Sequence, residues 1–94
     1  MRGRRVYVWR GICDMRRSFD RLARMVEEDL QRQPLNGDVY VFLNRGSDRM
    51  KALYWDRDGY VLWYKRLETG SFELPGGGGL AISQKRWQQM VQTV

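Results

Sequence analysis

The spacing of hydrophobic and polar positions predicts a strand and then a long helix in the first third of the chain. Within residues 5–10, β-branched and aromatic side chains alternate, as is typical of a strand. Apolar residues then recur at helical spacing from about Met15 to Gln33 and share one face: Met15, Phe19, Leu22, Val26 and Leu30. Asp14 is the expected N-cap, and Pro34 cannot continue the helix.

Four further strands are predicted after the helix, over Val39–Asn44, Arg49–Asp56, Tyr60–Leu67 and Ser71–Leu74. The first of them is apolar on both faces, which indicates a central place in the sheet. Arg57-Asp58-Gly59 is expected to close the next two into a hairpin, with glycine taking the positive φ of the turn. We therefore expect an α+β fold: a mostly antiparallel sheet of about five strands, with one long helix packed on it and a short C-terminal helix.

The end of the chain differs in composition from the rest. Gly76–Gly79 is a run of four glycines with high backbone entropy, which predicts a linker. Ser83 is the expected cap of a final helix over Gln84–Thr93, in which Trp87 belongs to an apolar stripe. The predicted organisation is an α+β domain over residues 1–75, a glycine linker over 76–79 and a C-terminal helical segment over 80–94.

Composition excludes several classes of protein. The 94 residues include one cysteine and no histidine, which excludes a disulfide framework, a cysteine-rich zinc site and histidine-dependent nucleophiles. No apolar run is long enough to span a membrane, and a lone thiol fits the reducing cytoplasm. We expect no cofactor and no catalytic residue. One enzymatic alternative is a Mg²⁺-dependent nuclease, which would need clustered carboxylates from Asp14, Asp20, Asp48 and Asp56.

Net charge points to an anionic partner. The chain carries 17 Lys and Arg against 11 Asp and Glu, a formal charge of +6, and the excess lies at its two ends. Arginine binds phosphate and carboxylate groups in a fork geometry, so DNA phosphates or an acidic protein surface are the expected ligands. The cations expected to hold phosphates are Arg4, Arg5, Arg16, Arg17, Arg45, Arg49, Lys51, Lys65 and Arg66. Lys51 and Lys65 fall on paired strands, which allows them to be near neighbours, and such a pair is unfavourable unless an anion lies between them.

Aromatic residues interleave with these cations between Asn44 and Arg66. Flat rings beside cations suit phosphates and exposed bases. The alternative is that the rings form the core and cross-strand pairs, while the cations solvate an open face. For a protein partner, the expected anchors are Trp55, Trp63 and Trp87.

Two ordered blocks of residues resemble a known family. The first is Cys13-Asp14-Met15-Arg16-Arg17-Ser18-Phe19-Asp20-x-Leu22. The second runs from Gly37-x-x-Tyr40-Val41-Phe42-x-Asn44-Arg45 through Asp48-Arg49-x-Lys51-x-Leu53-x-Trp55-Asp56-x-x-Gly59 to Leu62-x-x-Lys65-Arg66-Leu67-Glu68-x-Gly70-x-Phe72-x-x-Pro75. Over about residues 4–75 the chain resembles the small TnpB-type accessory protein of the insertion-sequence sixty-six family of bacterial transposable elements.

The resemblance implies an accessory factor that acts beside a separate, larger transposase. Our first hypothesis is a non-enzymatic accessory protein of DNA transposition that binds phosphates at the element ends through its basic and aromatic surface. The alternative is a protein-interaction module that docks on the transposase without contacting DNA.

Overall fold

A mixed sheet and one helix form the part of the chain described by this computed structural model, residues 4–73 and 81–82. The elements in chain order are β1 (Val6–Val8), α1 (Phe19–Asp29), the short 3₁₀ helix η1 (Pro34–Asn36), β2 (Val39–Leu43), β3 (Arg49–Asp56), β4 (Gly59–Arg66) and the two-residue β5 (Ala81–Ile82). The α+β class expected from the sequence is confirmed. Among the described residues, no helix is long and apolar enough to cross a membrane.

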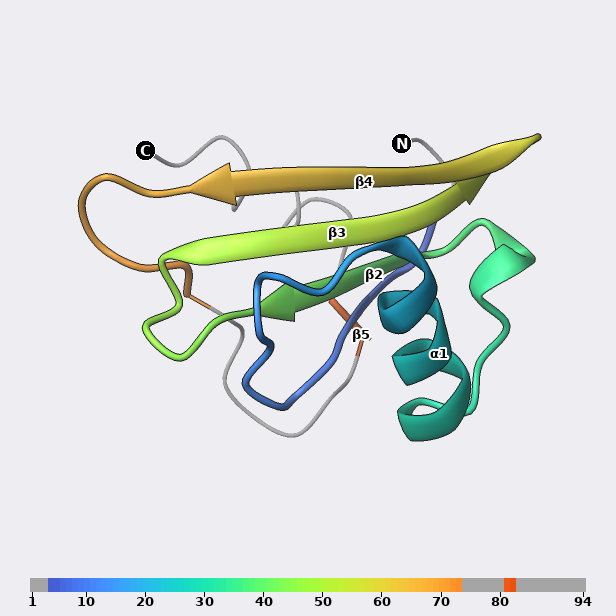
Figure 1. The fold of residues 1–94 in the computed structure, drawn as a ribbon, viewed down its shortest axis with the longest axis horizontal. Helices are drawn as coiled ribbons and strands as arrows, with labels where there is room; N and C mark the ends of the chain where they lie inside the picture. Colours follow the sequence, from blue (N-terminus) through green and yellow to red (C-terminus); the bar gives the residue numbers. More distant parts are fainter. Residues whose placement is uncertain (1–3, 74–80, 83–94) are drawn as a thin grey trace.

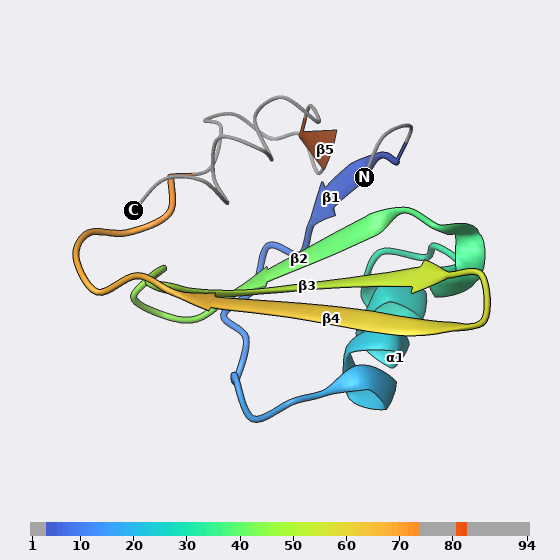
Figure 2. The ribbon, with the colours of Figure 1, turned by 90° about the horizontal axis from the view of Figure 1, so that it is seen from above.

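The strands lie in the order β4-β3-β2-β1-β5 (Figures 1 and 2). The pairs β3–β4, β2–β3 and β1–β5 are antiparallel, whereas β1 runs parallel to β2 with Val6 opposite Val39. A parallel pair needs a long crossover connection, and α1 with its flanking segments supplies it. The sequence pattern did not indicate this parallel pair.

Both faces of the sheet carry a hydrophobic core. On one face, α1 covers the sheet (Figure 2). There Leu22 and Val26 of α1 share a buried cluster with Tyr40 and Phe42 of β2. On the other face, a second cluster gathers around Val41 with other buried residues of β1, β2 and β3, joined by Leu67 and Phe72 from beyond β4. All five residues of β2 are buried, so the predicted central place of this strand is confirmed.

The helix is shorter than predicted. It begins at Phe19 after Ser18, and the prediction of Asp14 as the N-cap is wrong. The cause is tertiary, because the segment before the helix is held on the sheet. The Cys13 amide donates to the Leu43 carbonyl of β2 at 2.8 Å, and the Lys51 ammonium of β3 donates to the carbonyls of Met15 and Arg17. These carbonyls are therefore withdrawn from the bonds that a longer helix would require.

The fifth predicted strand is also wrong. Ser71–Glu73 is irregular; Phe72 is buried in the core, and its amide donates to the Ser47 carbonyl at 2.7 Å. The strand that joins the sheet instead is β5, just before the helix expected over Gln84–Thr93. Leu74, the glycine linker over 76–79 and the helix expected over Gln84–Thr93 lie outside the described residues.

The hairpin turn is correctly placed, but the residue with the positive φ is not the predicted glycine. The positive φ falls on Arg57, at 53°, and not on Gly59. A side chain with a Cβ is strained in this left-handed region, whereas glycine is not. We expect Arg57→Gly to raise the free energy of unfolding by about 0.5–1 kcal/mol, measured by urea denaturation. The matched variant Arg57→Ala keeps the Cβ and should give no such gain; an equal gain would assign the effect to the lost charge.

Candidate nucleic-acid interface

The topology separates the predicted arginines into two groups at opposite ends of the sheet. Arg4 and Arg5 lie just before β1, and the Arg4 guanidinium reaches the end of β3. The other group lies where β2 ends, β3 begins and β4 ends. We call this second group the arginine end, and it consists of Arg16, Arg17, Arg45, Arg49 and Arg66.

Arg4 holds the fold together. Its guanidinium donates to the carbonyls of Gly37 and Trp55 at 2.6 and 2.9 Å, and it pairs with Asp56 at 3.3 Å. It also lies 4.8 Å from the centre of the Tyr54 ring. These contacts join the start of β1 to the far end of β3, so most of its donors are already engaged.

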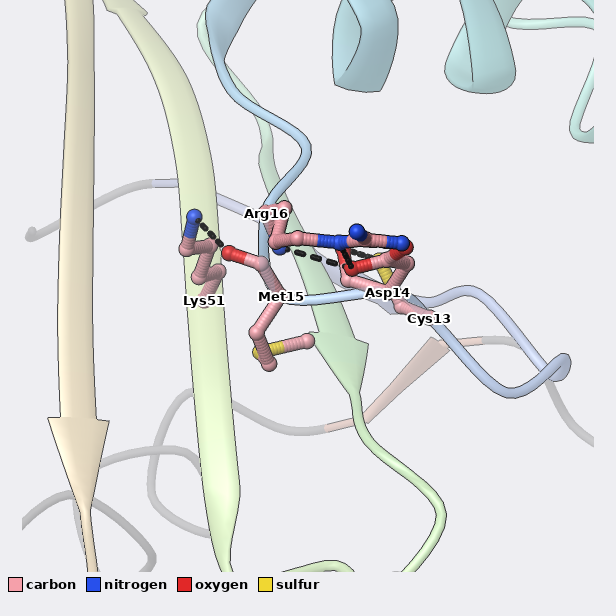
Figure 3. A network of polar contacts seen from close by, with 5 residues as sticks. All are labelled: Cys13, Asp14, Met15, Arg16 and Lys51. Atoms are coloured by element: carbon pink, nitrogen blue, oxygen red, sulfur yellow. Dashed lines mark hydrogen bonds and ion pairs between the residues drawn. The ribbon is translucent and has the colours of Figure 1, made fainter.

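Lys51 is likewise drawn into the interior. Lys51 is only 7% exposed, and its ammonium donates to the Met15 carbonyl at 2.6 Å (Figure 3). It also donates to the Arg17 carbonyl at 2.7 Å. The Tyr64 ring covers it, with Nζ 4.9 Å from the ring centre. Lys51 therefore positions the segment before α1. Lys51 and Lys65 are not cross-strand neighbours, because Lys65 lies opposite Met50 and projects from the other face of the sheet.

Two cross-strand arginines form the centre of the arginine end. Arg49 lies directly opposite Arg66 in the β3–β4 ladder, so their side chains leave the same face as neighbours. With Tyr64 and Glu68 they line an open hollow of about 400 Å³. Two like charges directly opposite each other destabilise a sheet unless an anion compensates them.

Acidic compensation at the arginine end is incomplete. Arg66 donates to Glu68 at 2.8 and 3.0 Å, and the carboxylate raises the pKa of the guanidinium. Arg16 is 91% exposed and folds back onto Asp14 at 2.7 Å (Figure 3), and the hydrogen bonds from Arg16 hold the pKa of Asp14 well below its usual range. Within the described residues, no hydrogen bond or ion pair engages the guanidinium of Arg45 or Arg49.

Arg17 occupies an intermediate position. Its guanidinium contacts the sulfur of Met25 at 3.3 Å, and its carbonyl accepts from Lys51. The contact is to a neutral, weak acceptor, so the positive charge of Arg17 is not cancelled.

Two of the expected anchors, Trp55 and Trp63, lie on opposite faces of the sheet. Trp55 is half-buried and meets Tyr60 edge to face, with the ring centres 5.1 Å apart. Trp63 packs against the core on the other face of the sheet, and Trp87 lies outside the described residues. The aromatic residue at the arginine end is Tyr64, which is 49% exposed. The sequence placed Tyr64 among five interleaved rings without distinguishing it, since exposure depends on the packing of α1 and the segment before it.

Carboxylates and the cysteine do not form a reactive centre among the described residues. No three metal-binding side chains gather there. Asp14 is bound by Arg16, Asp48 accepts from Asn44 at 2.7 Å, and Asp56 pairs with Arg4, so these acids serve local structure. Cys13 is buried, and burial raises the pKa of its thiol.

The fold and the site define a small α+β protein in which two cross-strand arginines, Arg49 and Arg66, lie side by side at one end of a mixed sheet. The chain belongs to the family described as IS66 Orf2 like protein, whose model matches residues 4–94. The resemblance noted in the sequence is therefore confirmed, and the family is associated with an accessory role in transposition.

Two relatives come from Sinorhizobium fredii (strain NBRC 101917 / NGR234). Uncharacterized protein y4hO is 41% identical over 81 residues, covering 84% of this chain and 70% of the relative. Uncharacterized protein y4jC is 35% identical over 92 residues, covering 96% of this chain and 79% of the relative. No solved structure matches the chain significantly.

Proposed function

We propose that this protein is a non-enzymatic accessory factor of transposition that binds the DNA backbone through its arginine end and acts in the cytoplasm. The observation that supports the proposal is the cross-strand pair of Arg49 and Arg66 at the arginine end, with Arg45 and Arg49 lacking an acidic partner among the described residues. An unsatisfied guanidinium beside a second arginine is suited to a phosphate, which accepts two parallel hydrogen bonds.

The arrangement favours phosphate contacts over sequence reading. α1 is packed on the sheet, and its outer face carries acids as well as arginines. Arginines at strand ends and in loops reach the DNA backbone and set the orientation of the protein on it. Tyr64, exposed between these arginines, offers a ring face to an unstacked base or a sugar.

We expect the double variant Arg45→Ala/Arg49→Ala to bind element-end DNA at least about tenfold more weakly, since two charge-assisted contacts are lost. A plot of the logarithm of the binding constant against the logarithm of salt concentration should become less steep by about 1.8, because each phosphate contact contributes about 0.9 to the slope. Fluorescence anisotropy at several salt concentrations measures both quantities.

The matched control is Arg21→Ala/Arg24→Ala, which removes the same charge from exposed positions of α1. Its affinity and salt slope should stay closer to those of the parent protein. Equal losses in both double variants would mean that net charge alone drives binding, which contradicts the proposed interface. Absence of DNA binding at low salt, together with co-purification with the transposase from nuclease-treated lysate, would support the docking alternative instead.

A further inference from the structure

We propose that two copies of this chain associate edge to edge through β4, so that their sheets join into one. β4 is an eight-residue strand at the end of the sheet order, and no strand of the described residues pairs with its outer side (Figure 1). An edge of this kind presents a row of unpaired N–H and C=O groups. Proteins usually protect such an edge with charges, proline or a β-bulge.

The middle of β4 lacks these protections. Residues 60–64 are Tyr-Val-Leu-Trp-Tyr, with neither a charge nor a proline. The ladder to β3 is continuous from Gly59 to Arg66, so no bulge interrupts it. The first four of these side chains are only partly buried and Tyr64 is exposed, which leaves apolar surface along the rim.

The hairpin register shows which backbone groups point outward. The turn closes with Asp56 opposite Gly59 around two residues, and such a closing pair exchanges both of its hydrogen bonds. Hydrogen-bonded pairs then alternate along the ladder. The outward N–H and C=O groups therefore belong to Tyr60, Leu62, Tyr64 and Arg66.

A second copy in antiparallel orientation matches this edge in one register. With Leu62 opposite the partner's Leu62, Tyr60 lies opposite the partner's Tyr64, and all of these residues use their outward backbone groups. Residues directly opposite each other share a face, so Leu62 meets its own copy and each Tyr60 meets a tyrosine. On the other face of the sheet, Val61 lies opposite the partner's Trp63.

The charges at the two ends of β4 favour a second copy as the occupant. Asp58 is exposed just before the strand, and Arg66 is exposed at its end. The same register brings Asp58 opposite the partner's Arg66 at both ends of the interface. Arg66 gives two of its five donors to Glu68, which leaves donors for a second carboxylate.

The joined sheet would keep both α1 helices on one face, because the two-fold axis stands perpendicular to the sheet. Both arginine ends would then lie on that same face, at opposite ends of the β4 pair. The dimer would thus present two cationic sites to one ligand, an arrangement that the single chain lacks.

Sedimentation velocity of the full chain over a range of concentrations tests the proposal, with Tyr64→Pro as the disrupting variant. Proline removes the N–H that donates to the partner's Tyr60, twice in each dimer, and we expect dimerisation to weaken at least about tenfold. The matched variant Tyr64→Thr loses the same ring but keeps the N–H, and it should still dimerise. Circular dichroism establishes that each variant is folded.

A charge exchange tests the register independently of the proline variant. Asp58→Arg places two cations opposite each other and should weaken dimerisation about tenfold, whereas Asp58→Arg/Arg66→Asp should recover it. Three results would overturn the proposal: a parent protein that stays monomeric at every concentration, a dimer indifferent to Tyr64→Pro, or one that Tyr64→Thr disrupts equally.

A monomer whose binding to the transposase is lost in Tyr64→Pro would assign the β4 edge to the transposase. If Tyr64→Pro does not fold, failure of the charge exchange to recover dimerisation decides against the proposal.

Discussion

Phe42→Ala is expected to lower the free energy of unfolding by about 3–5 kcal/mol, the largest effect of any change considered for this protein. Phe42 is fully buried in the central strand, beneath α1 and beside the Trp9 ring, whose centre lies 6.1 Å away. Removing the ring leaves a cavity that the flanking strands β1 and β3 prevent from closing. A domain of this size has a total free energy of unfolding of about 5–14 kcal/mol, so the variant should retain only a small part of it.

Phe19→Ala is the matched control for this prediction. The sequence pattern put Phe19 on the same apolar helix face as Leu22 and Val26, yet it is 41% exposed at the first residue of α1. We expect its loss to cost less than about 1 kcal/mol. Urea denaturation followed by tryptophan fluorescence measures both variants. Comparable losses for the two phenylalanines would contradict the packing described for α1.

Lys51→Met is expected to cost about 2–3 kcal/mol, because hydrogen bonds from a charged donor are worth about 1.5–3 kcal/mol and two acceptors lose their partner. Methionine has a similar length and is apolar, so the side-chain volume is nearly preserved. The carbonyls of Met15 and Arg17 lose their hydrogen-bond donor. Removing the ammonium also removes its own desolvation cost, which keeps the net loss below the sum of two full bonds.

The segment before α1 should respond more strongly than the rest of the fold. We expect the amides of residues 13–18 to exchange faster with solvent in Lys51→Met, while those of β2 stay protected. Arg49→Met is the control, since it removes one cation from the same face of the same strand, two residues away, and should change stability by less than about 0.5 kcal/mol. Uniform loss of protection in Lys51→Met would mean that the lysine supports the sheet in general and not this segment.

Elements with a strong local pattern were predicted well. β2, β3 and β4 lie within one residue of their predicted bounds, because alternating side chains and a two-residue turn are local properties of the chain. The centre of α1 follows equally from its 3.6-residue period. The α+β class and the family follow from these same stretches.

The helix start and the parallel β1–β2 pair required the three-dimensional structure. Residues 14–18 are compatible with a helix, but hydrogen bonds from β3 hold part of them on the sheet. The irregular path of Ser71–Glu73 has a similar cause, since the bond to Ser47 and the burial of Phe72 outweigh local strand preference.

By itself, the sequence determined the class of fold, most of its elements, the family and an arginine-rich character, since these depend on composition and on short-range periodicity. Only the tertiary structure decided which cations remain available to a ligand. Lys51 and Arg4 carry the same formal charge as Arg49, yet both donate hydrogen bonds to carbonyls of distant segments. Within the described residues, the Arg49 guanidinium has no such acceptor. Because the availability of a charge depends on long-range contacts, neighbouring residue types along the chain could not determine it.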